Sequence, residues 1–183
     1  MKRFAVALTI LALLAFAFSA TALGAKPLTT LTMDELPFQP ADGLSFSGVT
    51  FGFQIGGASS TDAHYNAFGP GATEFVQDPS LEGDSNGALT LSFDQPTTVL
   101  EFGIARSCFC TLSPGVSVEL FKPGAAGRSR GVMTMTTSPV VSFSEAHFSY
   151  SGPAVQTAVI TFPSPGFASR LALDNLSFHQ GEG

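Results

Sequence analysis

Apolar and polar residues alternate with a period of two along most of the chain after residue 28. Val49, Phe51 and Phe53, for example, are separated by Thr50 and Gly52. This alternation is typical of β-strands with one buried face. The same pattern recurs at 31–33, 89–93, 100–104, 116–120, 132–135, 141–143, 146–150, 155–162 and 170–178. It predicts an all-β protein of about nine or ten short strands.

Turn-forming residues separate the predicted strands. They stand at 42–43, 86–87, 94–96, 113–115, 122–124, 151–153 and 163–166. Short alternating strands joined by such turns favour an antiparallel β-sandwich. A jelly roll is the version we expect, because it places the first and last strands side by side.

The first 24 residues differ from the rest of the chain. A basic start, Met1-Lys2-Arg3, precedes an apolar run from Phe4 to Phe18, and small residues follow at 19–25. This order is typical of a secretory signal peptide with a small-residue cleavage site. We therefore predict a signal peptide over 1–24, a single sandwich domain over 25–183, and a secreted or periplasmic protein with no transmembrane segment in its mature form.

The composition of the chain argues against some classes of binding partner. Charged residues make up 12% of the chain and its net charge is −6, a balance that becomes more acidic once Lys2 and Arg3 are removed. Nucleic acids and anionic lipids are negatively charged and bind to positive surfaces, which an acidic protein lacks. We expect no nucleic-acid partner.

Two segments between strands are candidates for ligand contacts. Residues 54–74 form a long Gly- and Ser-rich segment that carries Asp62, His64, Tyr65 and Asn66. Aromatic and imidazole rings stack on sugars, and Asp and Asn bind hydroxyl groups, so these four residues are the predicted ligand-binding set. The alternative is that the segment is only a polar connection. A second, acidic loop is expected over 77–87.

The two cysteines stand two residues apart, as Cys108-Phe109-Cys110. Side chains at i and i+2 of a strand share a face, so a disulfide between them is the leading expectation in an oxidising compartment. Reduced or partner-linked thiols and metal ligation are the alternatives. A zinc site needs further ligands, and the three histidines have no motif spacing.

Asp174 and Asn175 interrupt an apolar strand near the end of the chain. The hydrophobic phase slips there, from Leu171 and Leu173 to Leu176 and Phe178, which indicates a β-bulge. Buried polar groups need partners. One solution is a calcium ion held by Asp174 with Asp34 or Glu35. The other is that Asp174 binds backbone amides nearby.

Four motifs carry a resemblance to known proteins. They are Leu31–Pro37, Gly48–Phe51, Ala88–Pro96 and Leu171–Phe178. Together they resemble bacterial exported proteins of the PEP-CTERM type, whose domains are similar to jelly-roll carbohydrate-binding modules and MAM-like domains. The resemblance implies an ion between first and last strands, at Asp34 or Glu35 and Asp174. The chain ends at 181–183 without the sorting tail of that type, which favours free release over anchoring.

The function expected from these observations is binding without catalysis. The chain has no G-x-S-x-G or H-E-x-x-H motif, and no pair of its 14 acidic residues is singled out as glycosidase carboxylates. We predict a secreted binding module for a glycan or a cell-surface or matrix component, stabilised by calcium. The alternative is a structural or adhesive matrix protein with no small ligand.

Overall fold

The computed structural model describes residues 27–124, 128–163, 166 and 168–179. The predicted signal peptide lies outside these residues. The described part of the chain contains no helix with the length and apolarity needed to cross a membrane.

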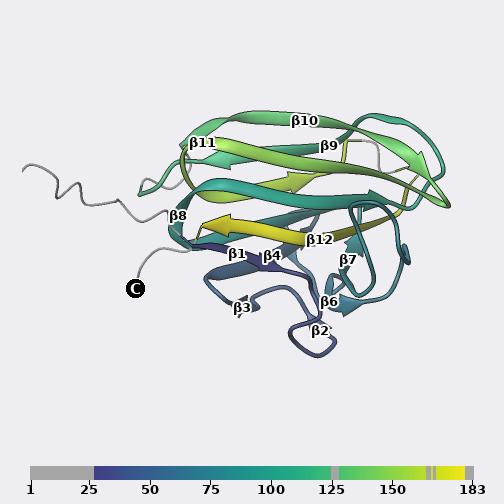
Figure 1. Ribbon diagram of the computed structural model, residues 1–183, viewed down its shortest axis with the longest axis horizontal. Helices are drawn as coiled ribbons and strands as arrows, with labels where there is room; N and C mark the ends of the chain where they lie inside the picture. Colours follow the sequence, from purple (N-terminus) through teal and green to yellow (C-terminus); the bar gives the residue numbers. More distant parts are fainter. Residues whose placement is uncertain (1–26, 125–127, 164–165, 167, 180–183) are drawn as a thin grey trace, which may run out of the picture.

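The described residues form an all-β, antiparallel structure of twelve strands (Figure 1). The strands are β1 Leu28–Leu31, β2 Gln39–Pro40, β3 Ser45–Phe46, β4 Val49–Ile55, β5 Ala58–Ser59, β6 His64–Ala67, β7 Ser80–Asp84, β8 Gly87–Arg106, β9 Leu112–Phe121, β10 Ser129–Val140, β11 Phe143–Thr161 and β12 Arg170–His179. The all-β prediction is confirmed. The predicted count of nine or ten was too low, because β2, β3, β5, β6 and β7 are short strands in segments expected to be loops or turns.

Two long strands join the layers of a sandwich. The first half of β8 pairs with β4, while its second half pairs with β12. The second half of β11 pairs with β9, and β11 follows β8 along most of its length. One layer is therefore β10-β9-β11-β8-β4, and the other is β11-β8-β12-β7-β6-β2. β1 lies beside β12, which places the first and last strands side by side as expected.

Two predicted turns are bends within these long strands. Residues 94–96 lie inside β8, and residues 151–153 lie inside β11. The pairing register between the two strands shifts between Ser151 and Val155, where both pass from one layer to the other. The turn signals at these positions therefore change the direction of a strand without reversing the chain.

The core lies between the two layers and is filled mostly by the predicted alternating residues. Phenylalanine dominates it, and the rings of Phe102 and Phe148 stack at 4.8 Å between centroids. Burying one such side chain contributes about 1.5–3 kcal/mol. The fully buried large residues include Phe51, Phe53, Phe102, Phe148, Phe178, Met33, Leu81, Leu89, Leu91 and Leu100.

Residues 68–79 connect β6 to β7, and we call this segment the strap. It covers part of the outer face of the layer that contains β8, β12 and β7. Its backbone packs so closely on β8 that a Cβ atom on Gly103 would lie 1.9 Å from the carbonyl oxygen of Phe75. Val76 of the strap is buried against Ala105 and Ala172. The predicted acidic loop over 77–87 is thus the end of the strap followed by β7.

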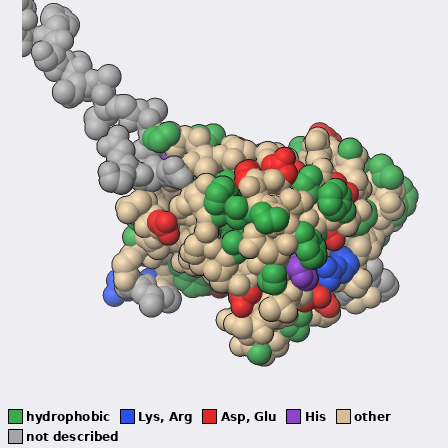
Figure 2. Space-filling view, turned by 90° about the horizontal axis from the view of Figure 1, so that it is seen from below, with side chains coloured by type: hydrophobic (Ala, Val, Ile, Leu, Met, Phe, Trp, Pro, Cys, Tyr) green, Lys and Arg blue, Asp and Glu red, His purple; other side chains and the backbone are tan. Residues whose placement is uncertain are grey.

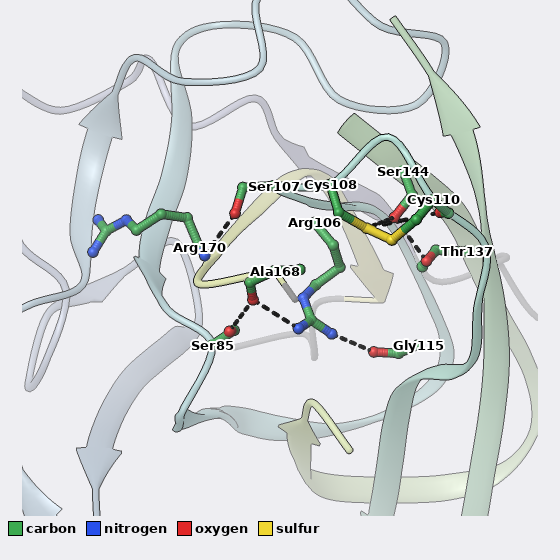
Figure 3. The surroundings of a disulfide bond; sticks show 10 residues. All are labelled: Ser85, Arg106, Ser107, Cys108, Cys110, Gly115, Thr137, Ser144, Ala168 and Arg170. Atoms are coloured by element: carbon green, nitrogen blue, oxygen red, sulfur yellow. Dashed lines mark hydrogen bonds between the residues drawn. A yellow bond between two sulfur atoms is a disulfide. The ribbon is translucent and has the colours of Figure 1, made fainter. Parts of the chain in front are cut away.

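One end of the sandwich is closed by a buried arginine next to the disulfide (Figure 3). Arg106 is fully buried at the end of β8 and donates hydrogen bonds to the carbonyl oxygens of Gly115, at 2.6 Å, and Ala168, at 2.9 Å. Cys108 and Cys110 are joined by a disulfide with an S–S distance of 2.04 Å. Of the three states expected for the cysteines, the structure contains the disulfide.

Candidate functional site

The structure brings the predicted acidic residues Asp34 and Glu35 near Asp174, in the middle of β12. Glu35 follows β1 and accepts hydrogen bonds from the Tyr65 hydroxyl and from the backbone N–H of Thr32, the latter at 2.7 Å. Burial raises the pKa of Glu35, but these hydrogen bonds outweigh it and lower the pKa overall. The charges of Glu35 and Asp34 in turn raise the pKa of Asp174, so the three carboxylates influence one another.

Asp174 lies at the predicted bulge, which the structure confirms. The pairing of β12 with β8 shifts between Asp174 and Ser177, and Asn175 has a positive φ of 54°. Asp174 is 3% exposed and accepts hydrogen bonds from the backbone N–H of Gln77, at 3.0 Å, and of Asn175, at 2.6 Å. Binding of nearby amides, one of the two expected solutions for this carboxylate, is therefore present, and it ties the strap to β12.

The described residues include no group of three or more His, Cys, Asp or Glu side chains arranged to hold a metal ion. The oxygens of Asp174 and Glu35 are engaged by the hydrogen bonds above, and Asp34 accepts a hydrogen bond from the Thr32 hydroxyl at 2.7 Å. These carboxylates therefore already have hydrogen-bond partners within the protein. The calcium site stays a prediction.

The pKa of Asp174 predicts a pH dependence of stability. Burial raises this pKa from 3.8 to about 6, more than the amide hydrogen bonds lower it. The folded protein therefore binds a proton more tightly than the unfolded chain, and Asp174 contributes more stability as the pH falls from about 7 to 4. Relative to Asp174→Asn, the wild type should gain about 1–3 kcal/mol over this range. Urea denaturation of both proteins at several pH values measures the difference. A constant difference across the range would contradict the raised pKa.

The predicted ligand residues lie in and just before β6, and the structure separates them. Tyr65 is fully buried and packs edge-on against Phe51, with ring centroids 5.9 Å apart. Its expected role as a sugar platform is not supported, because alternation along β6 turns this ring into the core. Asn66 donates a hydrogen bond to the carbonyl oxygen of Leu36 at 2.7 Å and so ties β6 to the segment after β1.

His64 and Asp62 remain at the surface, where they join two residues that the sequence did not single out. The ring of His64 stacks on Phe38 with centroids 4.6 Å apart and an interplanar angle of 5°. Phe38 is 63% exposed. Asp62 forms an ion pair with Arg170 at 2.9 Å, and the two side chains are 38% and 40% exposed. We call Phe38, His64, Asp62 and Arg170 the stacking site.

Strand pairing positions the rings of the stacking site. β2 pairs with β6 so that Pro40 faces His64, and this register brings Phe38, just before β2, over the imidazole. The Nδ1 atom of His64 lies 2.9 Å from the carbonyl oxygen of Asp62, an acceptor, so Nδ1 carries the proton and orients the ring. The platform is thus part of a hydrogen-bonded edge of the sheet.

Backbone and ion-pair contacts hold the charged half of the stacking site. Asp62 accepts a hydrogen bond from the backbone N–H of Asp84 at 2.6 Å, and Arg170 begins β12 opposite Asp84. Glu82 lies next to His64 in the pairing of β6 with β7. Burial raises the pKa of Glu82, although the charge of Arg170 opposes this shift.

Figure 2 shows the underside of the molecule, on which a histidine and basic side chains lie next to each other among apolar and acidic groups. Such a surface can take up a ligand that has both apolar faces and hydroxyl groups. The sequence offered little signal for Phe38 and Arg170, since neither belongs to a motif and each meets its partner only through strand pairing.

The chain has similar solved structures but matches no family model. No protein-family model matches it, and no curated protein matches its sequence. Among solved structures it is similar to a family 29 carbohydrate-binding module, with 13% identity over 85% of this chain and 90% of that chain and a TM-score of 0.42. A mutant of the CBM29-2 module in complex with mannohexaose is 14% identical over 86% of this chain and 94% of that chain, also with a TM-score of 0.42.

These neighbours are carbohydrate-binding modules, one of the classes that the sequence motifs resemble. At such TM-scores the likeness is coarse. The function proposed for this chain therefore rests on its own side chains, and kinship with PEP-CTERM proteins stays a prediction.

Proposed function

We propose that this protein is a non-catalytic glycan-binding module that acts outside the cytoplasm and takes up a sugar chain at the stacking site. The observation that carries the proposal is the Phe38–His64 stack, an exposed aromatic platform beside the Asp62–Arg170 ion pair. The N-terminal leader pattern and the disulfide support an oxidising compartment.

The chemistry of the stacking site suits a sugar. The C–H face of a pyranose packs on an aromatic ring, and Phe38 offers a face that is not covered by His64. Arg170 and Asp62 lie beside the platform as a donor and an acceptor for hydroxyl groups. Phenylalanine is a weaker platform than tryptophan, which the chain lacks. We therefore expect weak binding that is strengthened by neighbouring sugars of a polymer.

The same contacts favour binding over catalysis. Asp62 is held by Arg170 and by the backbone of Asp84. Both oxygens of this carboxylate accept hydrogen bonds from the protein, which hold it in place as an acceptor for a hydroxyl group. This arrangement favours recognition of hydroxyl groups by the charged pair.

The proposal predicts that Phe38→Ala lowers binding to an insoluble polysaccharide at least about tenfold, because it removes the exposed ring. The measurement is depletion of the purified protein from solution by a panel of polysaccharides, in calcium and again in chelator. Phe109→Ala is the matched control, since Phe109 is a 68% exposed phenylalanine beside the disulfide and is not one of the four residues of the stacking site.

Each outcome of this experiment is informative. Retention of the wild type and of Phe109→Ala, with loss for Phe38→Ala, supports the stacking site. Equal retention of both variants would place the glycan elsewhere, and no retention of the wild type would refute the glycan-binding proposal. Loss of retention in chelator would support the predicted calcium ion.

A structural or adhesive matrix protein is the second candidate function. The observation that favours it is the exposed outer strand β10, on which Val132 is 56% and Met133 39% exposed. Exposed strand edges of this kind pair with other chains.

A further inference from the structure

We propose that two copies of this chain associate through antiparallel pairing of their β10 strands. This association is independent of glycan binding, because β10 and the Phe38–His64 stack lie on opposite sides of the molecule. Figure 1 shows β10 at the top, while β6, which carries His64, and β2, which directly follows Phe38, lie at the bottom.

β10 is an edge strand over most of its length. From Ser129 to Thr137 its only partner among the described residues is β9, and β11 joins it only at Ser138–Val140. The register with β9 is regular from Gly131 to Met135 and shifts on either side. Five residues of regular strand, about 17 Å long, therefore present one backbone edge to solvent.

Between its two register shifts, the exposed edge has no charged residue or proline to protect it against pairing. Natural edge strands are protected by lysine, proline, inward-pointing charges or β-bulges. Between Gly131 and Met135 the sequence is Gly-Val-Met-Thr-Met, without a charged residue or proline. Neutral, strand-forming segments of this kind favour intermolecular sheets. Arg130 is bound to the carbonyl oxygen of Ala154 through its Nε atom, at 2.9 Å.

A second copy is the occupant that best fits this edge. A two-fold axis at Met133 would place Val132 opposite Thr134 of the second copy, so the neutral segment matches itself. An apolar groove of about 360 Å³, lined by Leu120, Met133, Tyr150 and Pro153 among others, lies beside the edge. The groove has room for an apolar side chain from the second copy.

Charge complementarity supports the antiparallel direction. The start of β10 is basic, with Arg128 and Arg130, whereas its other end borders a pocket that contains Thr136, Ser138 and Glu74. Antiparallel pairing brings the basic start of each strand to the Glu74 end of the other, twice in the dimer. A parallel pairing would instead place the arginines of both copies together.

The interface is small, so the dimer should be weak. A regular edge of five residues with its flanking side chains buries less than the roughly 1,200 Å² of a standard stable interface. We expect association that depends on concentration, seen by sedimentation velocity of the full chain between about 10 µM and 1 mM.

Val132→Lys tests the edge, and Val141→Lys is its matched control. Val132 is 56% exposed on the edge, and Val141 is 74% exposed in the turn after β10. Val132→Lys should weaken association at least about tenfold with no change in melting temperature. Val141→Lys should leave the association unchanged. Glu74→Arg should also weaken association, and adding Arg128→Glu should restore it.

A wild type that stays monomeric over this range would overturn the proposal. So would association that Val132→Lys does not alter, because the contact would then lie elsewhere. Capture of an unrelated extended peptide by β10, without self-association, would likewise refute a second copy as the occupant.

Discussion

Replacing Arg106 with alanine is expected to lower the free energy of unfolding by about 3–5 kcal/mol, because a buried side chain with several polar contacts is lost. The guanidinium is fully buried and bonds the carbonyl oxygens of Gly115 and Ala168. The Cζ atom of the Arg106 guanidinium lies 4.9 Å from the centroid of the Phe162 ring. Alanine removes all three contacts at once and leaves a cavity lined by two buried carbonyl groups.

The positive charge of Arg106 strengthens its hydrogen bonds to the two carbonyl groups. Burial lowers the pKa of Arg106 to about 10, so the side chain stays protonated at neutral pH. Arg106→Lys keeps the charge but loses the planar fork that reaches two carbonyl groups, and it should cost about 2–3 kcal/mol. Urea denaturation measures both variants, and the lysine variant remains informative if the alanine variant does not fold.

Arg128→Ala is the control for these variants. Arg128 is exposed ahead of β10, so its loss should change stability by less than about 0.5 kcal/mol. If Arg106→Ala lowered the free energy of unfolding as little as Arg128→Ala, the hydrogen bonds of Arg106 would not be what holds β8 to β9 and to the segment before β12.

Replacing Glu145 with alanine is expected to release the strap and to cost about 2–4 kcal/mol. Glu145 is 5% exposed and accepts hydrogen bonds from the backbone N–H groups of Glu74, at 2.9 Å, and Phe75, at 3.0 Å. The hydroxyl of Thr73 donates a third at 2.7 Å. Without the carboxylate, these strap donors lose a charged acceptor and Phe75 loses its anchor over Gly103.

The effect of Glu145→Ala should be local as well as global. Hydrogen exchange should speed up first at residues 73–76, while the strands of the core remain protected. Glu119→Ala, on the outer side of β9, is the matched control and should alter neither the strap nor its exchange. Uniformly faster exchange across the domain would show that Glu145 supports the sandwich as a whole and does not hold the strap in particular.

The local pattern of residues was enough to predict several features. Period-two alternation marked the core strands, because a strand with one buried face must place apolar side chains on every second residue. The slip in that alternation at Asp174 and Asn175 located the bulge, since an extra residue shifts the phase of the strand. The spacing of the cysteines made a disulfide the leading expectation.

Long-range pairing decided the features that the pattern missed. Turn-forming residues at 94–96 and 151–153 have the same local preferences in a hairpin and in a bent strand, and only the pairing of β8 with β11 distinguishes the two. Likewise, nothing local shows which face of a four-residue strand is buried, so Tyr65 was placed at the surface although β6 turns it into the core.

The sequence by itself determined the class of fold, the main strands, the bulge and the acidic, low-charge character of the chain. Tertiary structure alone decided that Phe38 stacks on His64, that Asp62 pairs with Arg170, and that Glu145 and Asp174 hold the strap. The reason is physical. Alternation and turn chemistry act between residues close in sequence, whereas these contacts join segments tens of residues apart, which meet only when the strands pair in one particular register.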